Sequence, residues 1–115
     1  MTYDDTLNQG ETWIRTYRVK NSDGSLYSLT GATVAMMIRQ DYSDLTPLIS
    51  LSSPSSGITI DTVAATITVT ITSTVTAAIA FRSAASLVYD IEVTQSGRVT
   101  RIIQGSIAFS PEVTR

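Results

Sequence analysis

The sequence of 115 residues contains neither cysteine nor histidine. Without cysteine the chain can form no disulfide and has no thiolate nucleophile. Without histidine it lacks the most common general base and a common zinc ligand. It also has no G-x-S-x-G motif, and its 6 glycines are scattered singly, so they form no phosphate-binding loop. These absences predict that the protein is not an enzyme and binds no cofactor or metal.

Charge is scarce as well. Charged residues make up 16% of the chain, against about 25% in an average globular protein. A small domain with so few surface charges is expected to cover part of its surface with partners, including copies of itself. The net charge is −2, and Lys20 is the single lysine, so no basic cluster is available for nucleic acid.

Export and membrane segments are not expected either. The N-terminus is acidic and polar, whereas a secretory signal begins with basic residues followed by an apolar run. The chain carries no charge between Asp61 and Arg82, a stretch long enough to span a bilayer. Within it, however, Thr alternates with Ile and Val over residues 66–72, which is the two-residue period of a strand.

A hairpin is the clearest structural prediction. Apolar residues alternate with polar ones over residues 87–94, residues 95–98 supply a turn, and an apolar-rich run resumes over residues 99–109. Gly105 interrupts the return strand. A bulge or sharp bend there would let the strand pass from one sheet to the other, and Pro111 would end its pairing.

The remaining pattern predicts an all-β fold, an antiparallel Ig-like or Greek-key β-sandwich of about seven to eight strands. One short helix is expected near residues 73–81, capped by Ser73 or Thr74. Residues 1–10 are predicted to be a flexible or docking arm that orders on contact with partners, and residues 11–115 a single domain. The strand at residues 66–72 is β-prone and uncharged, so its edges should be covered. The other strands are expected at residues 12–20, 33–40, 47–51 and 58–60.

Four residues are candidates for binding a partner. Trp13, Arg15 and Tyr17 would share one face of the first strand of the domain, and they are residue types that dominate binding hot spots. Tyr3 adds an aromatic side chain in the arm. For Trp13, packing in the core is the favoured alternative.

The carboxylates Asp90 and Glu92 lie two residues apart and so project from the same strand face. That geometry could begin an acid–base pair or a calcium site. A solvated face, with pairing to Arg98 or Arg101 across the hairpin, is the favoured interpretation.

Four stretches together resemble small virion proteins of tailed bacteriophages, including the N-terminal β-sandwich domain of upper-baseplate proteins of the BppU type. They are Gly10-Glu11-Thr12-Trp13, then Asp23-Gly24-Ser25 with Leu29-Thr30-Gly31-Ala32-Thr33-Val34, then Tyr89-Asp90-Ile91-Glu92-Val93, and finally Gly105-Ser106-Ile107 leading to Pro111-Glu112-Val113-Thr114. The resemblance implies a structural protein located in the virion, made in the host cytoplasm and acting through contacts with tail, baseplate or fibre proteins. Baseplate proteins usually continue into a coiled coil and a receptor-binding module, so an adaptor or fibre-attachment role is expected here.

Three alternatives remain open. The protein could decorate a capsid and clamp neighbouring shell subunits. It could be a sugar-binding β-sandwich, in which Trp13, Tyr17 or Tyr42 stacks on a sugar ring. It could be a carboxylate enzyme that uses Asp90 and Glu92.

Overall fold

Eight strands and one short helix make up the computed structural model, which describes residues 2–53, 56–79 and 85–111. In chain order they are β1 (Asp5–Asn8), β2 (Trp13–Arg18), β3 (Thr33–Arg39), β4 (Ile49–Ser52), β5 (Ile58–Asp61), β6 (Thr66–Ile71), α1 (Ser73–Ala77), β7 (Ala85–Gln95) and β8 (Arg98–Ser110).

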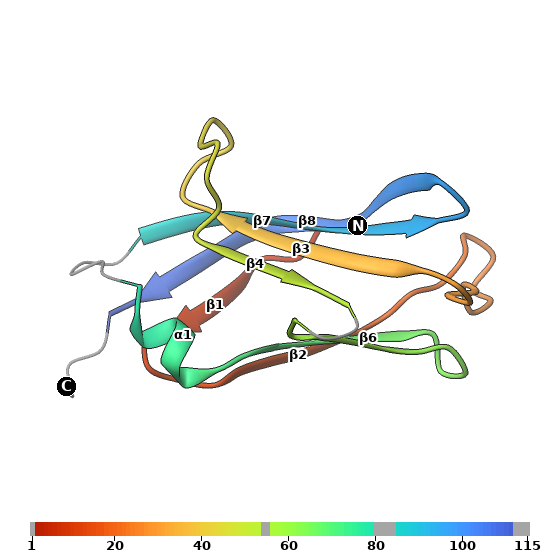
Figure 1. Cartoon of the computed structure of the whole chain (residues 1–115), viewed down its shortest axis with the longest axis horizontal. Coiled ribbons are helices and arrows are strands. Elements are labelled where there is room, and N and C mark those ends of the chain that lie inside the picture. The colour runs from red at the N-terminus through yellow and green to blue at the C-terminus, as the bar shows by residue number, and fades with distance from the viewer. Residues whose placement is uncertain (1, 54–55, 80–84, 112–115) are drawn as a thin grey trace.

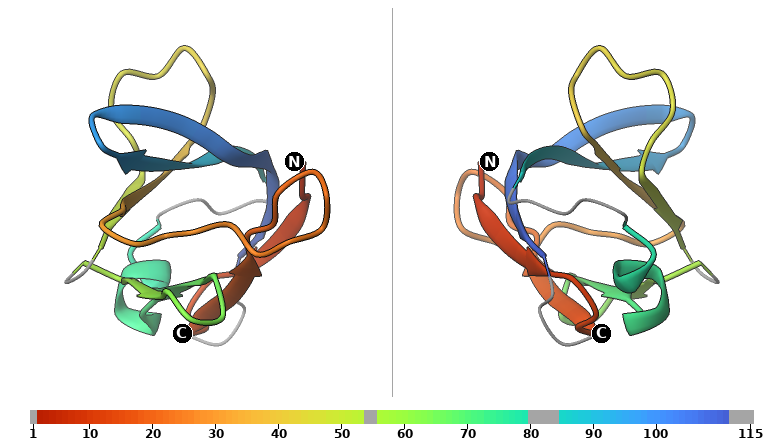
Figure 2. Two further views of the ribbon diagram at one scale, coloured as in Figure 1. Left: turned by 90° about the vertical axis from the view of Figure 1, so that its right-hand side faces the viewer. Right: turned by 90° about the vertical axis from the view of Figure 1, so that its left-hand side faces the viewer.

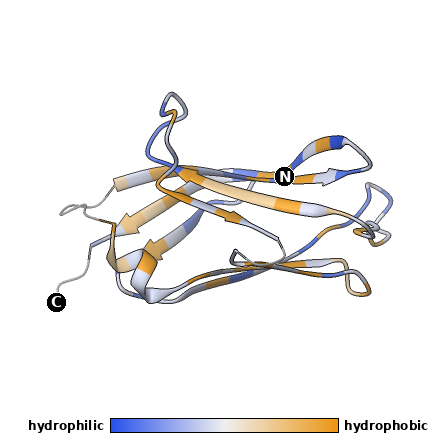
Figure 3. Cartoon of the chain, in the orientation of Figure 1, coloured by the Kyte–Doolittle hydropathy of each residue, from blue (hydrophilic) through white to orange (hydrophobic). Residues whose placement is uncertain are grey.

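The strands form two facing layers (Figures 1 and 2). One is a five-stranded sheet with the order β1-β8-β7-β3-β4, and the other is a three-stranded sheet with the order β2-β6-β5. Alternate side chains of both sheets point between the layers, where they build one core that excludes water. In Figure 3 the apolar residues concentrate along the strands, and hydrophilic residues gather at the tip of the β7–β8 hairpin.

The strand order is that of an immunoglobulin-like sandwich. In such domains strands B, E and D form one sheet, while G, F, C and C′ form the other. Here β2, β6 and β5 correspond to the first set, and β8, β7, β3 and β4 correspond to the second. The predicted Ig-like β-sandwich is therefore confirmed. Because the chain has no cysteine, non-covalent contacts hold the sheets together, without the inter-sheet disulfide of antibody domains.

The predicted hairpin is present as β7 and β8. Ser96 and Gly97 at its tip both have positive φ, 52° and 78°, as a tight two-residue turn requires. The register shifts once, because Ile91 pairs with Ile103 while Glu92 pairs with Arg101. The extra residue on β8 is therefore Ile102.

Gly105 does not have the role predicted for it. It pairs with Tyr89 in regular register, and β8 remains in the five-stranded sheet to Ser110. A Cβ built on Gly105 would lie 1.8 Å from the carbonyl oxygen of Tyr3. Glycine is needed because the N-terminal segment passes against this strand, a contact that local sequence cannot reveal.

The prediction of an arm at residues 1–10 is wrong for β1. Its residues pair in parallel with β8, from Asp5 opposite Ile107 to Asn8 opposite Ser110, and Leu7 is 0% exposed in the core. The polar composition of this segment hid the strand, since an edge strand of four residues buries few side chains. The segment Asp5–Asn8 is therefore a strand of the sandwich.

Two further predictions concern β6 and the helix that follows it. β6 is the central strand of its sheet, with β2 on one side and β5 on the other, so both of its edges are paired as expected. The helix α1 begins at Ser73 as expected, but its N-cap is Thr72, whose side chain accepts a bond from the Val75 amide. The helix ends at Ala77 with Ala78 as its C-cap, so the predicted helix is too long at residues 78–79, and residues 80–81 lie outside the described residues.

Candidate functional site

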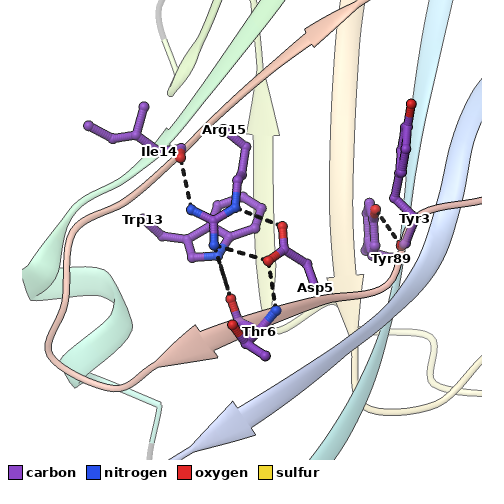
Figure 4. Close-up of polar contacts among 7 residues, drawn as sticks. All are labelled: Tyr3, Asp5, Thr6, Trp13, Ile14, Arg15 and Tyr89. Atoms are coloured by element: carbon purple, nitrogen blue, oxygen red, sulfur yellow. Dashed lines mark hydrogen bonds and ion pairs between the residues drawn. The ribbon is translucent and has the colours of Figure 1, made fainter.

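Trp13 and Arg15, two of the four residues predicted to bind a partner, lie at the margin where β1 and β2 face each other across the two layers (Figure 4). Trp13 is only 3% exposed, and its indole Nε1 donates to the carbonyl of Thr6 at 2.8 Å. Core packing, the favoured alternative for Trp13, is therefore correct. The indole ties the first strand of one sheet to the first strand of the other.

Arg15 closes this margin. Its guanidinium lies 4.6 Å from the centre of the Trp13 ring and forms two bonds to the Asp5 carboxylate, at 2.7 and 3.0 Å. Burial by itself would raise the pKa of Asp5, but bonds from Arg15 and from the Thr6 amide outweigh it and hold that pKa below its ordinary value. The Asp5 carboxylate in turn raises the pKa of Arg15. The pair is thus a charged clasp between the sheets.

Tyr3 and Tyr17 lie beside this clasp, with ring centres 6.1 Å apart. Tyr89 reaches the same place from β7 and donates its hydroxyl proton to the carbonyl of Tyr3 at 2.7 Å. Burial raises the pKa of both Tyr17 and Tyr89 above the ordinary tyrosine value, so both phenols are neutral at physiological pH. Of the four predicted residues, Tyr3 leaves the most surface open, at 46% exposed.

A second location has the shape of a binding site. On the outer side of the five-stranded sheet, residues 40–48 rise as a protruding loop (Figures 1 and 2). Between this loop and the sheet lies a hollow of about 220 Å³. We call this surface the loop face. Its lining residues are Met37, Arg39, Tyr42, Val88, Tyr89, Asp90, Arg101 and Gln104.

Polar contacts hold the loop face in place. Arg101 forms an ion pair with Asp90 at 3.2 Å and donates to the side-chain oxygen of Gln104 at 3.1 Å. Arg39 donates to the carbonyl of Asp44 at 2.8 Å and so ties the loop to β3. The predicted pairing of Asp90 with an arginine across the hairpin is confirmed for Arg101.

Apolar side chains around the loop face are exposed. Leu45 is 94% exposed, Tyr42 76%, Leu48 40% and Met37 36%. Apart from Tyr42, sequence reasoning does not select these residues, because local pattern cannot show which side chains of a strand and of the following loop lie exposed together. The available signal was Leu45, a lone large apolar residue between polar neighbours.

This geometry defines an Ig-like β-sandwich with a protruding loop that exposes apolar side chains. Beside the loop lies a small hollow lined in part by the polar side chains of Asp90, Arg101 and Gln104. In the described ranges, no group of three or more acidic, histidine or cysteine side chains could hold a metal ion. No helix among them is long and apolar enough to cross a bilayer.

Comparison with known proteins adds one finding. No family model matches the chain. No curated protein matches it either. Among solved structures it is similar to the natural killer cell receptor Nkp44, described as a triggering partner in natural cytotoxicity. The TM-score is 0.49 at 16% sequence identity, and the match covers 96% of each chain.

Proposed function

We propose that the protein is a structural component of a tailed-phage virion, an adaptor of the tail, baseplate or fibre attachment that acts through protein–protein contacts. The observation that carries the proposal is the loop face, where the exposed Tyr42 lines a hollow and Leu45 is exposed in the same loop. Large apolar side chains exposed together are typical of a surface that a partner covers. The virion setting rests on the resemblance described above.

The expected partner is a neighbouring virion protein that places an apolar side chain in the hollow. Tyr42 and Leu45 would cover that side chain, and each would contribute about 1.5–3 kcal/mol if fully buried. Asp90, Arg101 and Gln104 supply acceptors and donors for the partner's backbone at the floor. Because Arg39 already holds the loop through Asp44, little ordering would be needed on binding.

The test uses particles from the strain whose genome carries this gene. We expect mass spectrometry of purified particles to detect the chain, and electron microscopy with a labelled antibody to place it at the tail. Its absence from the particles would refute the virion role, and labelling over the head would establish the capsid alternative instead.

A variant experiment tests the contact surface. In the double variant Tyr42→Ala, Leu45→Ser, we expect the amount of the protein in particles to fall at least about tenfold, since two buried apolar side chains are lost. The matched control is Val63→Ser, because Val63 is 88% exposed but lies in the turn between β5 and β6. Normal incorporation of the double variant would exclude the loop face as the contact.

A further inference from the structure

The outer face of the three-stranded sheet carries an ordered array of short polar side chains. Its central strand, β6, points Ile67, Val69 and Ile71 inward, so the three threonines between them point outward. We call this surface the threonine face. Its members are Ile14, Thr16, Arg18, Thr59, Asp61, Thr66, Thr68 and Thr70.

The strand register arranges these residues in rows across the sheet. In the middle row, Thr68 lies between Thr16 and Thr59, and the hydroxyls of Thr16 and Thr68 are 3.2 Å apart. The end row places a charge on each side of a threonine. It consists of Arg18 on β2, Thr66 on β6 and Asp61 on β5.

Arg18 and Asp61 are both exposed. They lie on opposite sides of Thr66, each on the strand next to β6. Within the described part of the chain, Arg18 forms no ion pair. One carboxylate oxygen of Asp61 accepts from the amides of Val63 and Ala64, at 3.0 and 3.1 Å, which fixes the carboxylate in position. The face thus presents one positive and one negative edge at the same end.

We propose that the threonine face binds the same face of a second copy of this chain. The charges select one arrangement, a two-fold axis in the interface along β6. That axis places β2 of each copy opposite β5 of the other, so each Arg18 faces an Asp61 of the second copy, giving two equal ion pairs. An axis across the strands would leave both charges of each copy without opposite partners.

The packing requirements of such a pair are met. Two sheets pack face to face at about 10 Å when the facing side chains are short enough to interdigitate. Threonine suits this contact because its methyl group packs while its hydroxyl bonds to a neighbour across the interface. The three outward threonines of β6 would lie along the axis, and Ile14, which is 54% exposed, would be covered at the far end.

The size of the face sets the strength of the association. Three strands about 4.8 Å apart, with six residues in β2 and β6 and four in β5, cover at most roughly 14 by 20 Å. This is smaller than the about 800 Å² per partner that stable complexes bury. The dimer should therefore be weak in dilute solution and should form where copies are held close together, as in an assembled particle. This inference rests on the proposed function only where it assumes that an assembled particle holds the copies close together.

The test is the mass of the purified chain by light scattering from about 10 μM to about 1 mM, a range that covers weak dimers. We expect the average mass to rise from one chain toward two, and the rise to weaken in high salt. Thr68→Arg, which places a bulky charge on the axis, should abolish the rise. Thr33→Arg, an exposed threonine on β3 of the other sheet, should not.

Charge reversal tests the arrangement itself. Arg18→Asp should weaken dimerisation at least about tenfold, because two like-charged pairs replace two ion pairs. Adding Asp61→Arg should restore it, with circular dichroism confirming that both variants remain folded. A monomer at every concentration, or a dimer unchanged by Thr68→Arg, would overturn the inference. Detection of the chain in particles is measured separately, so the two proposals fail independently.

Discussion

At the residue scale, Gly105 and Tyr3 show how one contact fixes the N-terminus. The Tyr3 amide donates to the carbonyl of Gln104 at 3.0 Å, and the Tyr3 carbonyl accepts from Tyr89 at 2.7 Å. Both bonds hold the backbone of Tyr3 against Gly105. Gly105 is not among the glycines with positive φ, so its requirement is for space and not for an unusual backbone conformation.

Gly105→Ala should therefore destabilise the protein. The added methyl group would meet the carbonyl carbon and oxygen of Tyr3 at 2.7 and 1.8 Å, and backbone atoms cannot rotate away. We expect the free energy of unfolding to fall by about 1–3 kcal/mol, measured by urea denaturation. Ser110→Ala, at an exposed position of the same strand, is the control. Equal stability of the two variants would mean that Tyr3 does not lie against β8.

The Asp5–Arg15 clasp predicts a dependence of stability on pH. The pKa of Asp5 is lower in the folded chain than its ordinary value of 3.8. The ionised carboxylate therefore contributes stability above about pH 4, and this contribution is lost as pH falls through the folded-state pKa. Asp5→Asn should lower the melting temperature at pH 7, and the difference from the wild type should shrink as pH falls toward 3.

Circular dichroism at a series of pH values measures this effect. Asp44→Asn is the matched control, because Asp44 bonds to Asp41 and Arg39 through its backbone, and its carboxylate forms no hydrogen bond or ion pair within the described residues. A difference between wild type and Asp5→Asn that stays constant from pH 7 to pH 3 would contradict the role assigned to the ion pair.

At the scale of elements, β1 is the segment whose observed structure differs most from the sequence-based prediction. Four residues pair with the last strand, about a hundred positions away along the chain. Leu7 is the one fully buried side chain of β1, and it anchors the strand in the core. β1 also covers the edge of β8, which would otherwise expose unpaired backbone groups to other chains.

Leu7→Ala should cost about 2–5 kcal/mol of unfolding free energy, the range for removing a large side chain from a packed core. Thr6→Ala, at the exposed neighbouring position, should stay within about 0.5 kcal/mol. Hydrogen exchange should show faster exchange along β1 in the Leu7 variant. A change for Leu7→Ala no larger than for Thr6→Ala would support the original expectation of an arm.

At the scale of the whole molecule, the two sheets present different outer faces. The loop face combines exposed apolar side chains with a hollow, which suits a different protein. The threonine face carries mainly short polar side chains and one charge of each sign, which suits a second copy. The core lies between the faces and separates them by the thickness of the sandwich. If partners cover both faces as proposed, the low charge content of the chain is explained.

The two faces should consequently act independently. Thr68→Arg should abolish dimerisation, but it should not weaken the contact between the loop face and its partner in the particle. Leu45→Ser should lower incorporation into particles and leave the dimer unchanged. Effects at well-separated sites are expected to add. A variant that carries both Thr68→Arg and Leu45→Ser should therefore lose dimerisation and show the same reduced incorporation as Leu45→Ser alone. Light scattering and particle mass spectrometry provide the two readings. A dimer lost in the Leu45 variant would show that the faces are coupled.

The sequence by itself determined the fold class and most strands. Strand alternation and turn residues depend on neighbours along the chain, so β2, β3, β6 and the β7–β8 hairpin could be predicted from local pattern. The hairpin also predicted an arginine partner for Asp90, Arg98 or Arg101, and the structure shows that it is Arg101.

Tertiary structure alone decided the rest. The place of β1, the need for glycine at position 105 and the bond from Trp13 to Thr6 all depend on how the folded strands lie against one another. The loop face and the threonine face likewise exist only once strands from different parts of the chain lie side by side. Periodicity reports which side chains share a strand face, but only the folded sheets determine which of those faces meet and which stay exposed.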